Sequence, residues 1–209
     1  MSFINIPVVM SMIGAVGGVI PPGTLTFGTP GTSPSSSLGL SPFSFAYDYS
    51  FCAWILTAAE LGSTPRTFTS LEMYLGAMSD TTYTMNNQSF KMAHIDRDNW
   101  TGDLPFVDLT DQNLTGDTQV RTSGTEVYTK ATQVDTWIDF TFDNTFSYNG
   151  VDAVVIYSKQ NDGSYNFGGP LFDIENVTGN VAYKRTDSSY PTGSSFLSTE
   201  RPIMKLNYS

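Results

Sequence analysis

The sequence predicts an all-β protein, a two-sheet antiparallel β-sandwich of the jelly-roll type preceded by an extended N-terminal arm. Short segments in which apolar and polar residues alternate recur along most of the chain, which is typical of strands with one wet face. Clusters of Gly, Asn and Asp separate these segments, as turns do in sandwiches. Strands do not alternate with long helical patterns, so an α/β nucleotide-binding fold is not expected.

Residues 136–157 contain the clearest strand patterns. Ile138, Phe140 and Phe142 alternate with polar residues, which predicts a half-buried strand. Residues 151–157 are almost continuously apolar and rich in β-branched residues, so we expect a strand buried on both faces. The dipeptide Asn149-Gly150 between them favours a type I′ turn and therefore predicts a hairpin.

The remaining elements follow from the same patterns. Residues 43–55 predict an aromatic-rich strand, and residues 56–61 a single helical turn that ends at Gly62. Asp162-Gly163 predicts a second tight turn that leads into residues 165–167. Further strands are expected at residues 71–75, 90–95, 106–109, 120–128, 171–174, 181–183 and 203–208.

Composition limits the possible functions. Ten basic and twenty acidic residues give a net charge of −10, so nucleic-acid binding is not expected. A single cysteine, Cys52, excludes an intrachain disulfide bond. A single histidine, His94, leaves little material for Ser-His or Cys-His catalysis, and we expect no enzymatic activity.

Residues 1–42 are expected to form the arm and residues 43–209 the sandwich. No charged residue occurs before Asp48, and Pro, Gly and Ser are frequent there. The arm can fold along its own domain, be clamped by neighbouring copies or other capsid or tail proteins, or insert residues 4–20 into a membrane. We expect the clamped arm, because an uncharged segment can lie against other subunits without burying charge.

Several stretches together resemble the cleaved-adhesin-type jelly-roll domains of Bacteroidetes surface proteins. These are YSFCAWILTAAELG at residues 49–62, FKMAH at residues 90–94, Trp100, and the stretch from Trp137 to Ile156. The resemblance implies a carbohydrate-binding-like or adhesin-like jelly roll without catalytic activity, which in some members holds structural calcium.

One short loop, IDRDNWTGD at residues 95–103, is dense in oxygen ligands. Asp96, Asp98 and Asp103 are candidate ligands for a structural Ca²⁺, which takes six to eight oxygens. The alternative is an ordinary solvated acidic loop. No other cofactor is expected.

A ligand-binding site is expected around exposed aromatic rings. Tyr165 and Phe167 lie among glycines and amides in residues 161–169, and Tyr190 lies beside Pro191 in another loop. Aromatic faces beside hydrogen-bonding groups suit sugar rings. The alternative is that these rings cap the end of the sandwich or contact a neighbouring subunit.

The function expected from these observations is that of a structural virion protein of a phage. Such a protein would be a capsid decoration or cement, a penton-associated protein or a tail component, held by its arm with the sandwich outward. The alternative is a carbohydrate-binding adhesin module, extracellular or on a cell surface, that recognises host or environmental glycans.

Overall fold

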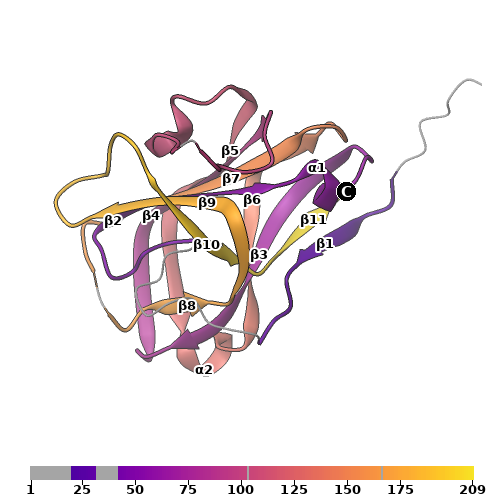
Figure 1. Cartoon of the computed structure of the whole chain (residues 1–209). Coiled ribbons are helices and arrows are strands. Elements are labelled where there is room, and N and C mark those ends of the chain that lie inside the picture. Colours follow the sequence, from indigo (N-terminus) through magenta and orange to yellow (C-terminus); the bar gives the residue numbers. More distant parts are fainter. Residues whose placement is uncertain (1–19, 32–41, 103, 166) are drawn as a thin grey trace, which may run out of the picture.

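The computed structural model describes residues 20–31, 42–102, 104–165 and 167–209, and these form two antiparallel sheets packed as a sandwich (Figure 1). One sheet has the strand order β1-β11-β3-β6, with β8 beside β3, and the other has the order β10-β9-β2-β7-β4-β5. The strands of the first sheet are β1 (Gly23–Phe27), β3 (Arg66–Met78), β6 (Thr136–Tyr148), β8 (Pro170–Phe172) and β11 (Met204–Tyr208). Those of the second are β2 (Tyr49–Leu56), β4 (Thr82–Ile95), β5 (Leu114–Thr129), β7 (Ala153–Asn161), β9 (Ile174–Thr186) and β10 (Phe196–Pro202).

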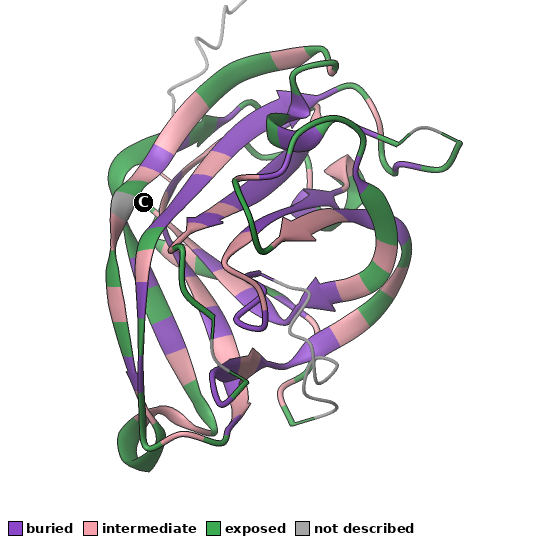
Figure 2. Cartoon of the chain, turned by 90° about the vertical axis from the view of Figure 1, so that its left-hand side faces the viewer, coloured by how far each residue is buried: buried purple, intermediate pink, exposed green. Residues whose placement is uncertain are grey.

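The main core lies between the two sheets, where alternate side chains of each strand meet (Figure 2). Phe90 of one sheet lies with its ring centroid 5.1 Å from that of Phe140 in the other. Phe43, which precedes β2, packs 5.2 Å from Phe90 on the same cluster. Aromatic contacts across the interface therefore hold the two layers together.

A second apolar cluster covers part of the outer face of the six-stranded sheet. The loop between β4 and β5 lies beside this sheet (Figure 1). Its Trp100, Val107 and Leu109 are buried in the cluster. On β7, Val154 and Ile156 face the main core, while Val155 and Tyr157 face the second cluster. The predicted strand buried on both faces is confirmed for residues 153–157 of β7, whereas Val151 is 72% exposed and precedes the strand.

The prediction of a hairpin across Asn149-Gly150 is wrong. β6 pairs with β3 in one sheet, and β7 pairs with β2 and β4 in the other, so the chain crosses between sheets at this point. Gly150 has a φ of 78°, but Asn149 does not adopt the positive φ that a type I′ turn also requires there. The Asn149 side chain instead accepts hydrogen bonds from the backbone N–H groups of Val151 and Asp152.

The segment 106–109 also differs from the prediction, because it is not a strand, and Tyr165 and Phe167 lie outside strands as well. Val107–Leu109 forms a short 3₁₀ helix, η1, in which Asp108 and Leu109 have φ values of 60° and 55° that no strand accepts. Past Gly163 the chain leaves β7 for β8 in the opposite sheet. The expected helical turn is confirmed as α1 (Ala58–Leu61), which Thr57 caps. A second short helix, α2 (Lys130–Gln133), links β5 to β6.

The described part of the expected arm belongs to the sandwich. β1 pairs antiparallel with β11, and Phe27 is buried in the main core. The Gly31 N–H donates to the buried Asp173 carboxylate at 2.6 Å. The sandwich thus starts before residue 43, and residues 1–19 and 32–41 of the expected arm lie outside the described residues. Within the described residues, no helix has the length and apolarity needed to cross a bilayer.

Candidate binding groove

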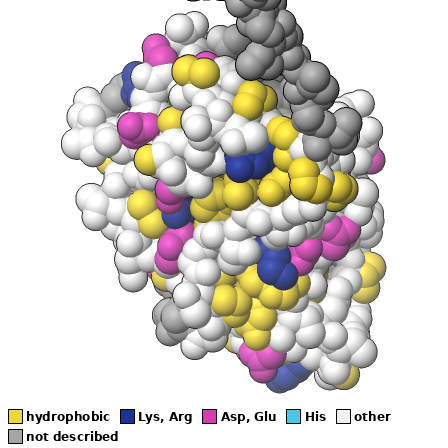
Figure 3. Space-filling model, turned by 90° about the vertical axis from the view of Figure 1, so that its right-hand side faces the viewer, with side chains coloured by type: hydrophobic (Ala, Val, Ile, Leu, Met, Phe, Trp, Pro, Cys, Tyr) yellow, Lys and Arg dark blue, Asp and Glu magenta, His cyan; other side chains and the backbone are white. Residues whose placement is uncertain are grey.

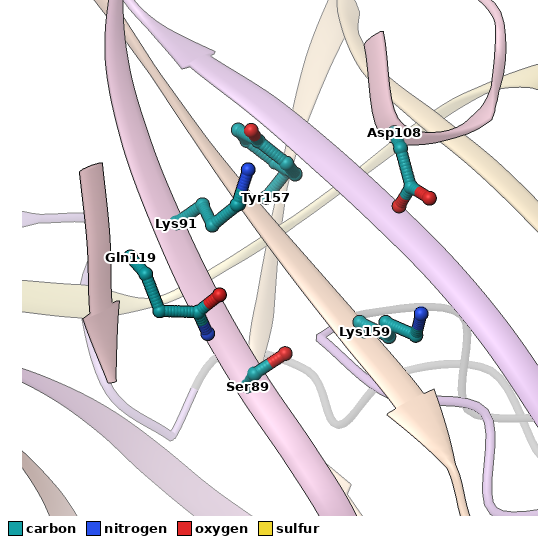
Figure 4. Close-up of a pocket in the computed structure, with 6 residues that line it drawn as sticks. All are labelled: Ser89, Lys91, Asp108, Gln119, Tyr157 and Lys159. Carbon is teal, nitrogen blue, oxygen red and sulfur yellow. The ribbon is translucent and has the colours of Figure 1, made fainter. Parts of the chain in front are cut away.

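A polar groove runs over β4, β5 and β7 on the outer face of the six-stranded sheet, beside the second apolar cluster (Figure 4). It consists of two adjoining hollows of about 180 Å³ and 480 Å³ that share Ser89, Gln119 and Lys159. The smaller hollow is also lined by Lys91, Asp108 and Tyr157, and the larger by Asn87, Thr122 and Asn161.

Strand geometry places these side chains together. Every second residue of β4 from 87 to 91 and of β7 from 157 to 161 lies on the outer face. The antiparallel register sets Ser89 opposite Lys159 and Lys91 opposite Tyr157. Gln119 of β5 lies opposite Lys91 on the other side. The floor of the groove is therefore a grid of polar groups on three paired strands.

One wall of the groove is a linked set of Tyr157, Asp117 and Lys91. The Tyr157 hydroxyl donates to Asp117 Oδ1 at 2.6 Å, and Lys91 Nζ donates to Asp117 Oδ2 at 2.8 Å. The Lys91 ammonium also lies 5.5 Å from the centroid of the Tyr157 ring. Burial, together with the hydrogen bond to Asp117, raises the pKa of Tyr157, so the phenol stays neutral and keeps its donor role.

A second group of one tyrosine, one aspartate and one lysine lies across the small hollow. The Tyr190 hydroxyl donates to Asp108 Oδ1 at 2.9 Å, and Lys159 Nζ lies 3.9 Å from the centroid of the Tyr190 ring. Burial and the Asp108 carboxylate raise the pKa of Tyr190. Asp108 reaches the groove from η1, and Figure 4 shows its side chain extending toward the sheet that carries Lys159. Asp108, which has an uncommon positive φ, thus lies at the groove.

The three aromatic residues predicted to bind a ligand do not form one site. Tyr165 and Phe167 are 55% and 67% exposed, with ring centroids 5.6 Å apart. They line a separate hollow of about 400 Å³, together with Tyr47 and Asp187. Tyr190 instead packs against the second apolar cluster and contacts Lys159 in the groove.

The acidic loop places Asp96 and Asp98 on the surface, where they line a hollow with Asp152 and Arg97. Within the described residues, no three His, Cys, Asp or Glu side chains are grouped so that they could hold a metal ion. Asp103 lies outside the described residues. Calcium binding by this loop therefore stays a prediction.

His94 has a structural environment. Its side chain is buried, Nε2 accepts a hydrogen bond from the Asn149 N–H at 3.2 Å, and the ring lies 4.9 Å from that of Phe146. These contacts place the ring at the crossing between the two sheets, on the core side of β4 and not in the groove.

The chain matches no protein-family model, and a search of curated proteins finds no similar sequence.

Proposed function

We propose that this chain is a non-enzymatic saccharide-binding module, displayed on a virion or a cell surface, that holds a glycan in the groove over β4, β5 and β7. The carrying observation is the grid of polar groups, in which Ser89, Gln119 and Lys159 connect both hollows. Sugar hydroxyls donate and accept hydrogen bonds at once. Amide, hydroxyl, ammonium and carboxylate groups in one groove supply partners of both kinds.

The charges of the groove favour a neutral saccharide. Its two lysines, Lys91 and Lys159, are matched by the carboxylates of Asp117 and Asp108. A ligand therefore needs no net charge to fit, and the net charge of −10 on the whole chain repels polyanions. Neutral glycans fit this balance better than sulfated or phosphorylated ones.

The groove is also held by hydrogen bonds within the chain itself. Its floor lies on paired strands, and both tyrosines are fixed by hydrogen bonds to carboxylates. Groups that are already ordered lose little conformational entropy on binding, which favours affinity from a small contact area.

A glycan array followed by calorimetric titration of the best hit tests the proposal. We expect Gln119→Ala and Lys159→Ala each to weaken binding by about tenfold, since each removes one or two hydrogen bonds. Lys130→Ala is the matched control, because it removes the same charge from an exposed residue of α2, outside the groove. Binding that survives both groove variants, or an array without hits, contradicts the proposal.

The exposed Tyr165 and Phe167 pair is the competing position for a glycan. A Tyr165→Ala, Phe167→Ala double variant separates the two positions, since these rings line a different hollow. We expect this variant to bind like the wild type. Loss of the hits here, with binding retained in the groove variants, would transfer the site to the aromatic pair.

A second candidate function is that of a structural virion component held by its N-terminal segment. The observation that favours it is the absence of charge before Asp48, combined with the position of β1 at the edge of a sheet. An uncharged segment leading from a sheet edge can lie against other subunits at little desolvation cost. Deletion of residues 2–19, which leaves β1 intact, should abolish co-sedimentation with particles. Unchanged sedimentation contradicts this function.

A further inference from the structure

β1 is an edge strand with no obvious protection against pairing. Its five residues pair with β11 without a register shift, from Gly23 opposite Tyr208 to Phe27 opposite Met204. No described strand pairs with its other side, so that side presents free backbone N–H and C=O groups. Residues 20–31 contain no charged side chain, and Thr24 and Thr26 are exposed.

The edges of the six-stranded sheet are protected. β10 carries Glu200 and has an irregularity in its register between Ser198 and Glu200, although its Phe196 and Leu197 are exposed. β5 carries three charged residues, Asp117, Arg121 and Glu126. Charges and bulges of this kind discourage pairing with another chain.

The other edges of the five-stranded sheet are protected too. The open side of β6 is bridged to β5, because the Thr122 N–H donates to Asp143 at 2.6 Å and Arg121 donates to the Thr141 carbonyl at 3.0 Å. β8 is three residues long and begins with Pro170, which has no N–H to donate. Among the strands that the structure describes, β1 is thus an edge with neither a charged side chain nor an irregularity in its register.

The absence of charge on β1 allows the strand that pairs with it to come from a second copy of the chain. Copies that each carry a charge of −10 repel one another over most of their surfaces. β1 is a place where two copies can approach without opposing charges. Figure 3, which faces the side of the molecule carrying β1, shows a band of hydrophobic side chains with Lys, Arg, Asp and Glu side chains along it. A two-fold axis brings the same edge of each copy together and satisfies both.

We propose that two copies of this chain associate through β1, which pairs antiparallel with β1 of the second copy. The two five-stranded sheets then form one continuous sheet. The paired stretch is short, since Pro21 and Pro22 precede it and Gly28, at a φ of 78°, ends it. The pair would carry two polar grooves, and two weak sites on one particle bind a repetitive surface more tightly than one. The association itself does not depend on what the groove binds.

Sedimentation equilibrium of the full chain tests this interface. The variant is Thr24→Lys, which puts a charge on the edge of β1 and removes the Thr24 hydrogen bond to Asn207. Thr199→Lys is the matched control on β10, where Thr199 is likewise exposed and bonded to an asparagine, Asn176. We expect wild type and control to form dimers and Thr24→Lys to dimerise at least tenfold more weakly.

Hydrogen exchange of the unmodified chain gives an independent measurement that needs no variant. Amides of residues 23–27 should become better protected as protein concentration rises, while those of β10 should not. Three results would overturn the proposal. They are a wild type that stays monomeric, equal dimerisation of the two lysine variants, and amide protection that does not depend on protein concentration. Dimerisation that is lost on deletion of residues 2–19, with β1 intact, overturns it as well, because the leading segment would then be what covers the edge.

Discussion

Replacing Arg201 with Met should destabilise the fold strongly, because this side chain joins three separate elements. Its side chain is 3% exposed, and Nη2 lies 2.6 Å from Glu60 at the end of α1 and 2.8 Å from Glu175 on β9. Nη1 also donates to the Ile55 carbonyl of β2 at 3.3 Å. Met keeps much of the apolar volume, so the substitution chiefly removes the charge and its hydrogen bonds.

The magnitude follows from what the substitution leaves behind. Removal of one partner from a buried ion pair costs about 3–5 kcal/mol. The side chains of Glu60 and Glu175 are 30% and 26% exposed, so both carboxylates remain partly hydrated and the low end of that range applies. We expect a loss of about 3 kcal/mol in the free energy of unfolding, which corresponds to a fall in Tm of about 6–12 °C for a chain of this size.

The pH dependence gives a second signature. Burial alone would raise the pKa of Glu60, but hydrogen bonds from Arg201 and Thr57 lower it below its usual value of 4.5. A lowered pKa means stability that is present above pH 4.5 and is lost as the pH falls through the folded-state pKa. In Arg201→Met this part of the acid dependence should flatten.

Urea unfolding monitored by tryptophan fluorescence, at pH 7 and in steps down to about pH 3, measures both effects. The triple variant with Glu60→Gln and Glu175→Gln is the control, and it should recover part of the loss because no unpaired carboxylates remain. A cost below about 1 kcal/mol for Arg201→Met would refute the reasoning, since the ion pairs would then behave as exposed ones.

Three further predictions concern Asp173, Gly76 and the acidic loop. Burial raises the pKa of Asp173, so its ionisation costs stability as the pH rises above 3.8. Asp173→Asn should therefore raise Tm at pH 7 in calorimetric scans, and this gain should vanish below pH 3.8. A Cβ on Gly76 would lie 1.9 Å from Asp173 Oδ1, so Gly76→Ala should lower the free energy of unfolding in urea by about 1–3 kcal/mol. Gly124→Ala is the control and should cost far less, because no atom lies nearer than 3.8 Å to the added Cβ. If the acidic loop binds calcium, Ca²⁺ should raise Tm, and Asp98→Asn should remove that rise; a Tm that does not respond to Ca²⁺ contradicts the site.

The fold class could be predicted from the sequence because it depends on local patterns. Alternation in residues 90–95 and the continuous apolar run before Tyr157 identify strands and their buried faces without knowledge of their partners. The crossing at Asn149-Gly150 could not be predicted in this way. A tight turn has the same local sequence signature whether the next strand joins the same sheet or the opposite one, and that choice is set by long-range packing.

The groove was missed for the same reason. Ser89 and Lys91 alternate with the core residues Phe90 and Met92, so the sequence does mark polar positions on β4. On β7 the residues between Tyr157, Lys159 and Asn161 are polar too, so no such alternation marks the groove there. Their proximity depends on the pairing of β4 with β7, in which Ser89 lies opposite Lys159, 70 positions later in the chain. Tyr190 joins them only because its loop folds back over the sheet.

The outer face of the six-stranded sheet has an apolar part, the second cluster, and a polar part, the groove. Tyr157 belongs to both. The wall of the groove on the apolar side is made by loops, since Asp108 and Tyr190 both come from outside the strands. Changes in the length or sequence of these two loops can therefore reshape the recognised ligand while every strand pairing stays as it is. The sandwich is in this sense a fixed frame for an exchangeable recognition surface.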